Sequence, residues 1–371
     1  MNIFSHVAGC AVIVSVVLGQ GLGDGLDFKH QEATQPSQPA GISARGDRVD
    51  VPSQSSEQPD TSPGTWECWT PLQTVPCNHN LFVVDALSET DAWAAGEAGT
   101  FMHWDGIAWE PVPSSTLANL HAIDMLSTTD GWAAGSGVIL HWDGNVWTEV
   151  ENPSHAVLTS LAMVGPTDGW GVDPDSPIMH WDGSAWTSQA STWDDEIYAV
   201  SMASAIDGWA VGGFLNPWGN YDNPVAWHWD GQTWTSVALP LTSSYMEYLS
   251  AVDVISSDDA WAVGGGYASP SGYFSTILHW DGESWTRMPS PTSVHLTVVA
   301  MSSPVDGWAS GRGYNSTTGE TGVPSPTSRR ISVVSLASPA SGWAVGAGGA
   351  ILRFTGPTSA VQLYLPLIEH G

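Results

Sequence analysis

Residues 139–150, "ILHWDGNVWTEV", decide the fold, because two tryptophans, a histidine and an aspartate lie within twelve residues and the pattern returns along the chain. The run His-Trp-Asp-Gly occurs five times, beginning at His103, His141, His180, His228 and His279. A sixth, degenerate copy, "RFTG", occupies residues 353–356. The spacing of the copies indicates whether the pattern builds a structure or performs a reaction.

The copies belong to a repeating unit of about 38 to 52 residues, a period typical of propellers and solenoids. Each unit contains four short β-type runs separated by Gly, Ser, Asp and Pro, with no helical period. A Trp-containing step in units one to seven begins at Asp91, Asp130, Asp168, Asp207, Asp259, Asp306 and Ser341. The repeat therefore predicts an all-β, seven-bladed β-propeller with four-stranded antiparallel blades.

Most of the 22 tryptophans belong to this repeat. Seven follow the Asp/Ser step, five follow the repeat histidine and five more end a unit, which makes seventeen. The five that end a unit are Trp109, Trp147, Trp186, Trp234 and Trp285. Burial of a large side chain stabilises a fold by roughly 1.5–3 kcal/mol, so we expect these residues to hold neighbouring blades together.

The two ends of the repeat predict how the ring closes. The last unit stops after "AILRFTG" without the final Trp-containing run, whereas "CWTPL" at residues 68–72 has such a run and no blade of its own. We expect this N-terminal segment to form the outer strand of the last blade, fastened by a Cys68–Cys77 disulfide. Unit six lacks its "ILHWDG" run between Gly311 and Ile331, so the sixth blade should be degenerate.

The segments outside the repeat differ from it in composition. Residues 1–19 contain a 13-residue apolar run and predict a signal peptide, although no Lys or Arg precedes that run. Residues 20–64 are rich in Gln, Pro, Ser, Thr and Gly and predict a disordered linker. The propeller should span residues 65–357, followed by a C-terminal tail at 358–371. We therefore expect an exported, extracellular or cell-envelope monomer with no membrane insertion after signal cleavage.

The charge restricts the partners. The chain has 38 acidic and eight basic residues, a formal net charge of −30. Nucleic acids and anionic membranes are repelled by such a surface. A cation, a cationic surface or a neutral ligand such as a glycan remains compatible with it.

The pattern "DGWAVG … ILHWDG-x-x-W" resembles BNR/Asp-box-like bacterial propellers, in particular the photosystem II assembly-factor-like group, over residues 66–356. The resemblance implies the propeller architecture. Five units carry His where that group has a blade arginine, and only Arg353 keeps it. The basic patch of the group is thus mostly absent here, and its assembly role is not carried over.

An enzymatic use of His-Trp-Asp-Gly would pair His with Asp for catalysis or metal binding. Five copies spread around a ring cannot converge on one site, so we expect Asp-Gly to form a turn and His to pack between blades, with no cofactor and no catalytic residue. A sialidase-type site needs an arginine cluster, and the repeat offers only Arg287, Arg312, Arg329, Arg330 and Arg353. A secreted glycoside hydrolase or lyase with an unrecognised carboxylate pair stays the alternative.

The loops favour a binding function. Strand 2–3 loops and inter-blade links emerge on one face of a propeller, and units four, five and six lengthen the 2–3 loop with aromatic residues. We predict a non-enzymatic recognition module for a glycan or an extracellular protein, although a purely structural envelope role would also fit. The predicted ligand-binding residues are Trp193, Phe214, Asn216, Trp218, Tyr221, Asp222, Tyr245, Tyr267, Tyr273 and Tyr314.

Overall fold

A computed structural model gives the fold of the chain. It describes residues 65–68, 79–175, 178–189, 195–215, 221–241, 246–268, 272–290, 292–304, 306–312, 331–355 and 365–367. The chain divides into two compact units, one of Met1–Val17 with Ser62–Gly371 and one of Leu18–Thr61, and all described residues belong to the first. Among the described residues, no helix has the length and apolar character needed to cross a membrane.

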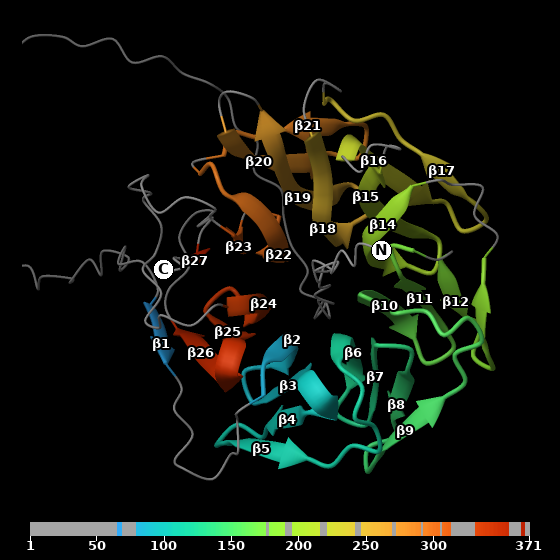
Figure 1. Cartoon of the computed structure of the whole chain (residues 1–371), viewed down its shortest axis with the longest axis vertical. Helices are drawn as coiled ribbons and strands as arrows, with labels where there is room; N and C mark the ends of the chain where they lie inside the picture. The colour runs from blue at the N-terminus through green and yellow to red at the C-terminus, as the bar shows by residue number, and fades with distance from the viewer. Residues whose placement is uncertain are drawn as a thin grey trace, which may run out of the picture. The chain divides into compact units, whose positions relative to one another are not determined.

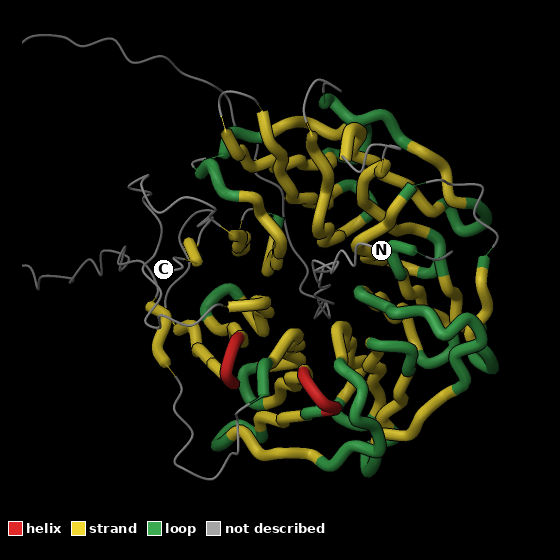
Figure 2. The backbone as a smooth tube through the Cα atoms, viewed as in Figure 1, coloured by secondary structure: helices red, strands yellow, loops and turns green. Residues whose placement is uncertain are grey.

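The described strands form an all-β propeller, as predicted. Six sheets are four-stranded antiparallel blades, one fewer than the seven predicted, and the sheet of unit six has three strands. Figure 2 shows strands on every side of the ring, with only the short helices η1 (Glu97–Gly99) and η2 (Ala347–Gly349) in red.

Units one to three supply β2 (Leu81–Ser88), β3 (Asp91–Gly96), β4 (Phe101–Trp104), β5 (Trp109–Val112), β6 (Leu120–Ser127), β7 (Asp130–Gly135), β8 (Ile139–Trp142), β9 (Trp147–Val150), β10 (Ser160–Gly165), β11 (Asp168–Val172), β12 (Met179–Trp181) and β13 (Trp186–Ser188). Units four and five supply β14 (Glu196–Ser204), β15 (Asp207–Leu215), β16 (Tyr221–Trp229), β17 (Trp234–Ser236), β18 (Met246–Ser256), β19 (Asp259–Ala268), β20 (Gly272–Trp280) and β21 (Trp285–Arg287). Units six and seven supply β22 (His295–Ser303), β23 (Asp306–Arg312), β24 (Ile331–Ser338), β25 (Ser341–Gly346) and β26 (Ala350–Thr355), while β1 (Thr65–Cys68) and β27 (Leu365–Leu367) come from the two ends of the chain.

The sheets are arranged in a closed ring. The first strand of each unit, called the inner strand below, packs against the inner strand of the next unit in the order β2, β6, β10, β14, β18, β22 and β24, and β24 packs against β2. Figure 1 shows these inner strands around the centre of the ring. Because every sheet has two neighbours, both of its faces are buried, which explains the apolar residues on alternating sides of each strand.

Hydrogen bonds join neighbouring inner strands in a belt that the sequence pattern did not reveal. In six of the seven junctions, a side-chain oxygen of one inner strand accepts the backbone N–H of the next inner strand, at 2.6–3.1 Å. The acceptors, called the acceptor belt, are Asp85, Asp124, Ser160, Ser201, Asp253 and Ser335. Unit six has Ala300, which cannot accept, immediately before the belt donor Met301.

Three members of the acceptor belt are buried carboxylic acids. Asp85, Asp124 and Asp253 are each 1% exposed. Burial raises the pKa of Asp253 to about 7, and burial together with the nearby charge of Asp124 raises the pKa of Asp85 well above its ordinary value. A carboxyl whose pKa is higher in the folded than in the unfolded chain stabilises the fold when protonated, and this contribution is lost as the pH rises through the folded pKa.

We expect the free energy of unfolding to fall as the pH rises from about 4 to about 8, by roughly 4 kcal/mol from Asp253 alone, because one pKa unit corresponds to about 1.4 kcal/mol. The variant Asp253→Asn keeps an oxygen for the Met301 N–H and cannot ionise, so it should remove that part of the fall. Urea unfolding across this pH range measures both slopes, and identical slopes for the two proteins would contradict the assignment.

The N-terminal strand closes the last blade, as predicted, but with different residues. β1 spans Thr65–Cys68 and pairs antiparallel with β26, so that Trp66 lies opposite Phe354. Trp109 lies opposite Trp104 in the same register in unit one. The outer strand therefore lies at 65–68 rather than at the predicted 68–72, because Trp66 takes the position opposite Phe354 that Trp109 takes opposite Trp104. Cys77, and with it the predicted disulfide, lies outside the described residues.

The sheet of unit six is incomplete in the described residues, in agreement with its predicted degeneracy. Its strands β22 and β23 pair antiparallel, and β27 pairs with β23 in parallel over Ser310, Gly311 and Arg312. Part of the predicted C-terminal tail, residues 358–371, therefore belongs to this sheet.

Removing β1 should open the ring. A chain that begins at residue 69 should melt at least about 5 °C below one that begins at residue 61 and should aggregate more, because β26 then becomes an exposed sheet edge. Thermal melts under reducing conditions exclude any effect of the cysteines. A chain that begins at residue 20 is the control and should match the chain from 61. Equal melting of all three chains would contradict closure by β1.

Candidate functional site

Each His-Trp-Asp-Gly run ends in a tight turn between the third and fourth strands, as predicted. The aspartate Oδ1 accepts two backbone N–H groups two and three residues ahead, at 2.8–3.0 Å, and the following glycine has a φ of 86° to 90°. These hydrogen bonds favour the ionised carboxylate and lower the pKa of each aspartate, and in Asp182 an additional Ser184 hydroxyl is the largest cause and brings the pKa to about 2. The turn aspartates are Asp105, Asp143, Asp182, Asp230 and Asp281.

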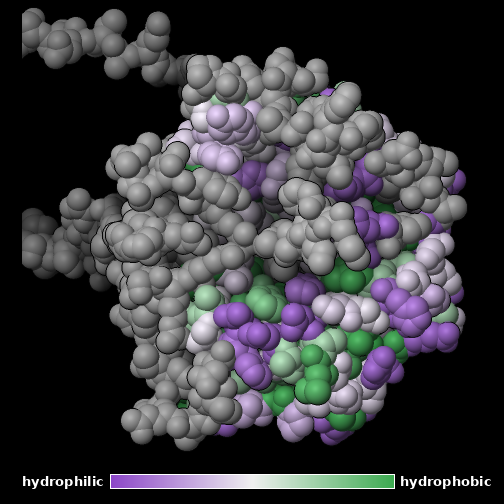
Figure 3. Space-filling view, in the orientation of Figure 1, coloured by the Kyte–Doolittle hydropathy of each residue, from purple (hydrophilic) through white to green (hydrophobic). Residues whose placement is uncertain are grey.

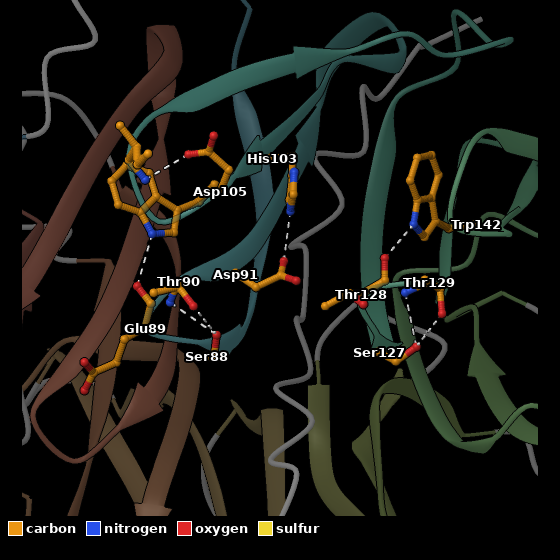
Figure 4. A network of polar contacts seen from close by, with 12 residues as sticks. Ser88, Glu89, Thr90, Asp91, His103, Asp105, Ser127, Thr128, Thr129 and Trp142 are labelled. Atoms are coloured by element: carbon orange, nitrogen blue, oxygen red, sulfur yellow. Dashed lines mark hydrogen bonds and ion pairs between the residues drawn. The ribbon is translucent and has the colours of Figure 1, made fainter.

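The repeat histidine bonds to the aspartate that begins the second strand of its own unit. The Nε2···Oδ1 distance is 2.6–3.2 Å in all five copies. Each imidazole also stacks on the tryptophan of that second strand, with ring centroids 4.3–4.7 Å apart. Figure 4 shows one copy, in which His103 points toward Asp91. The histidine therefore acts mainly within its unit rather than between blades.

The same second-strand tryptophan joins its unit to the next one. In five junctions it contacts the third-strand tryptophan of the next unit at 4.7–4.9 Å between centroids and the fourth-strand tryptophan at 4.9–5.6 Å, edge to face. The third-strand indole N–H donates to a carbonyl of its own strand 1–2 turn, as from Trp142 to Thr128 in Figure 4. The three tryptophans of each junction are called a tryptophan triad below.

Unit seven replaces both polar members of this arrangement together. Ser341 stands in place of the aspartate, and Arg353 stands in place of the histidine. The guanidinium of Arg353 lies 5.5 Å from the ring centre of Trp343 and 5.6 Å from that of Trp104 in unit one. A cation between two aromatic rings thus replaces the Asp–His pair where the ring closes.

The five histidines are structural by this geometry, because each is satisfied inside its own unit and no two converge. Among the described residues, no group of three His, Cys, Asp or Glu side chains could hold a metal ion.

Replacing one of these histidines should therefore affect stability only. His141→Ala should lower the free energy of unfolding by about 1–2 kcal/mol, because a half-buried ring that stacks on Trp132 is lost. Val146→Ala, in the exposed turn of the same unit, should change it by less than about 0.5 kcal/mol. Chemical denaturation measures both values, and a bound transition metal that survives chelator dialysis and is lost in His141→Ala would overturn the structural role.

Half of the ten predicted ligand-binding residues lie outside the described residues. These are Trp193, Asn216, Trp218, Tyr245 and Tyr314. The backbone of Phe214 lies in β15, and that of Tyr221 and Asp222 in β16, while only Tyr267 and Tyr273 are described with their side chains.

The second and third strands of units four and five extend beyond those of units one and two, at the places where the sequence lengthens the loops. In unit five, β19 continues to Ala268 and β20 begins at Gly272, whereas β3 of unit one ends at Gly96. Tyr267 and Tyr273 lie opposite each other near the end of this hairpin. Their rings are 5.1 Å apart at 65°, and the residues are 37% and 40% exposed, so that they form an aromatic corner open to solvent.

A polar cluster lies one register position deeper in the same hairpin. Glu247 is fully buried, accepts the hydroxyl of Thr276 and lies 3.4 Å from a guanidinium nitrogen of Arg287. That guanidinium also lies 5.7 Å from the ring centre of Phe274. No described group donates to Glu247 Oε2. The cluster fixes the base of the hairpin. It also pairs Arg287, the one arginine described in unit five.

Sequence reasoning missed a set of bulges near the loop end of the inner strands. In six units the pairing of the inner strand shifts by one residue, and the extra residues are Phe82, His121, Tyr198, Ser250, Thr297 and Ser332. Bulges redirect a side chain and occur often beside functional sites. Bulge residues of neighbouring units contact each other, as Phe82 does when it stacks on His121 with the ring centroids 5.4 Å apart. In the sequence, each extra residue directly follows a leucine or isoleucine of its inner strand. This recurrence was the signal that could have revealed the bulges.

One pair in this region has the elements of a nucleophile and a base. Ser250 Oγ lies 2.8 Å from His295 Nε2, and the imidazole stacks on Tyr248 at 4.5 Å. Both members of the pair are only 7% exposed. In units one and two, the strand position of His295 holds Asn80 and Asn119, whose amide oxygens accept a backbone N–H of the preceding unit. The Ser250–His295 hydrogen bond therefore connects two neighbouring units, as the asparagine side chains do in units one and two.

The ring of antiparallel sheets and the tryptophan triads define this chain as a β-propeller. No protein-family model and no curated protein matches it. Among solved structures it is similar to YCF48 bound to D1 peptide, with 16% identity and a TM-score of 0.56 over 79% of this chain and 97% of that one. It is similar to a catalytically inactive virginiamycin B lyase from Staphylococcus aureus with quinupristin, at 11% identity and a TM-score of 0.59 over 80% and 100% of the two chains. The Neurospora crassa Pan2 WD40 domain has 11% identity and a TM-score of 0.55 over 80% and 98%.

At these identities the likeness shows the fold alone. The presence of YCF48, a photosystem II assembly factor, agrees at that level with the resemblance inferred from the repeat.

Proposed function

We propose that this protein is a non-enzymatic recognition module that binds an extracellular polypeptide on the loop face of units four to six. In this proposal the ring is a seven-bladed, BNR/Asp-box-like propeller in which the three-stranded sheet counts as a blade. The protein acts as an exported monomer, and the signal peptide is absent from the mature chain.

The exposed Tyr267–Tyr273 corner carries the proposal. Both rings project from an extended hairpin on a rigid scaffold, and aromatic residues at such positions often anchor a partner. Rings that meet at 65° form a corner rather than a flat platform. A protruding side chain fits a corner, whereas a sugar ring stacks best on a flat aromatic face, so we favour a polypeptide over the glycan that the composition also allowed. The YCF48 complex supports the choice of ligand class, because a propeller of similar fold is bound to a peptide.

Tyr267→Ala and Tyr273→Ala should each weaken binding of the partner by about 2 kcal/mol, as expected for anchor residues. The melting temperature should stay within about 1 °C of the parent, because both side chains are partly exposed and lie near the end of the hairpin. The partner would be isolated from extracellular protein by affinity capture on the mature propeller, and its affinity measured by calorimetry.

Leu117→Ala is the matched control, because Leu117 is 86% exposed and lies in the link between β5 and β6 of units one and two. It should leave the affinity unchanged. If the tyrosine variants bind as tightly as the parent while Leu117→Ala binds weakly, the binding surface lies over units one and two and the proposal fails.

A further inference from the structure

We propose that the partner segment of this propeller is basic and that an arginine side chain of the partner occupies the Tyr267–Tyr273 corner. This inference rests on the proposed function and adds the chemistry of the ligand. It follows from the distribution of charge over the described residues and from the geometry of the two rings.

The described surface has an excess of negative charge that the two arginines described with their side chains do not balance. Two arginines are described with their side chains, and both are engaged. Arg287 is paired with Glu247 and covers Phe274, and Arg353 is held between the rings of Trp104 and Trp343. The five turn aspartates stay ionised at pH values below the ordinary aspartate pKa, because hydrogen bonds hold the carboxylates. These strand 3–4 turns lie at the opposite end of the blades from the strand 2–3 hairpin that carries the two tyrosines, so they add to the negative charge of the whole surface rather than to the corner itself. Such a surface attracts cationic partners and repels anionic ones.

The aromatic corner supplies a specific place for one cation. The face of a tyrosine ring attracts a guanidinium, which also stacks on it through its planar group. Two rings at 65° offer one face and one edge to the same group, so a planar guanidinium can lie on one ring and contact the other. Arg353 already shows this arrangement inside the protein, with its guanidinium about equally far from two indole rings.

The one arginine described in unit five is already paired, so it does not oppose a cation at the corner. Arg287, the nearest described guanidinium in the hairpin, lies on the side of Glu247 and Phe274, which alternate along the strands with the two tyrosines. Its charge is neutralised by a carboxylate with a further oxygen that no described group reaches. Figure 3 shows hydrophilic residues interspersed with apolar ones over β2 to β9, so units one and two, which carry no part of the corner, present a mixed surface.

Three labelled peptides of equal length test this inference by fluorescence anisotropy: an alternating Arg-Ser peptide, the same peptide with citrulline for arginine, and one with glutamate for arginine. Citrulline keeps the shape of arginine without its charge. We expect the arginine peptide to bind at least about ten-fold more tightly than the citrulline peptide, and the glutamate peptide not to bind. Raising the salt from about 0.05 M to about 0.5 M should weaken the arginine peptide, because screening shortens the reach of the charges.

The site is tested with variants on the same peptides. Tyr267→Ala and Tyr273→Ala should reduce the preference for arginine over citrulline about ten-fold, whereas Tyr267→Phe should retain it, because the ring face remains. Ile206→Ala, exposed between β14 and β15, should change nothing.

Equal affinity for the arginine and citrulline peptides, or an arginine preference that the tyrosine variants keep, would overturn the inference. Tyrosine-dependent binding of the citrulline peptide without an arginine preference would leave the proposed function standing and remove only the basic partner. Failure to bind any of the three peptides, together with tyrosine-independent binding of the captured partner, would remove both.

Discussion

The structure depends on the packing of one tryptophan in the second strand of each complete unit. In units one to four this ring stacks on its own histidine on one side and meets two tryptophans of the next unit on the other, and Trp343 does the same with Arg353 in place of histidine. The Asp–His pair orients the stack, the turn aspartate fixes the hairpin beneath it, and the indole N–H of the third-strand tryptophan ties the strand 1–2 turn. The acceptor belt adds a second connection between units at the inner strands.

A scaffold held by repeated contacts can tolerate local extensions, and this chain places them in adjacent units. The hairpins of units four and five are longer than those of units one and two, and the Tyr267–Tyr273 corner lies near the end of one of them. The deeper pair of Glu247 and Arg287 anchors that hairpin without using the tyrosines. In the proposed function, stability and recognition therefore depend on different residues of the same sheet.

The repeat predicted the propeller, its four-stranded blades and the N-terminal strand, because a Trp-rich period is visible in sequence. The register of β1 was wrong because both "TWEC" and "CWTPL" contain a tryptophan, and the sequence does not show which of the two pairs with β26. The proline in "CWTPL" does not decide between them, since the outer strand β5 contains Pro111. The strand β27 was missed because it pairs in parallel and copies no part of the repeat. Asp85 and Asp253 resemble solvent-facing residues in an alternating pattern, and their burial follows only from the neighbouring inner strand. Tyr267 and Tyr273 could be named as candidates because the lengthened loop is visible in the sequence, and the structure describes both as partly exposed.

Hydrogen–deuterium exchange of the mature propeller, with and without its captured partner, tests most directly whether the repeat is scaffold and the extended hairpin is the binding surface. Binding should slow exchange in residues 246–275, which include both tyrosines, and should leave exchange in the five His-Trp-Asp-Gly turns unchanged. Protection of those turns by the partner, with no change at the hairpin of unit five, would contradict this assignment.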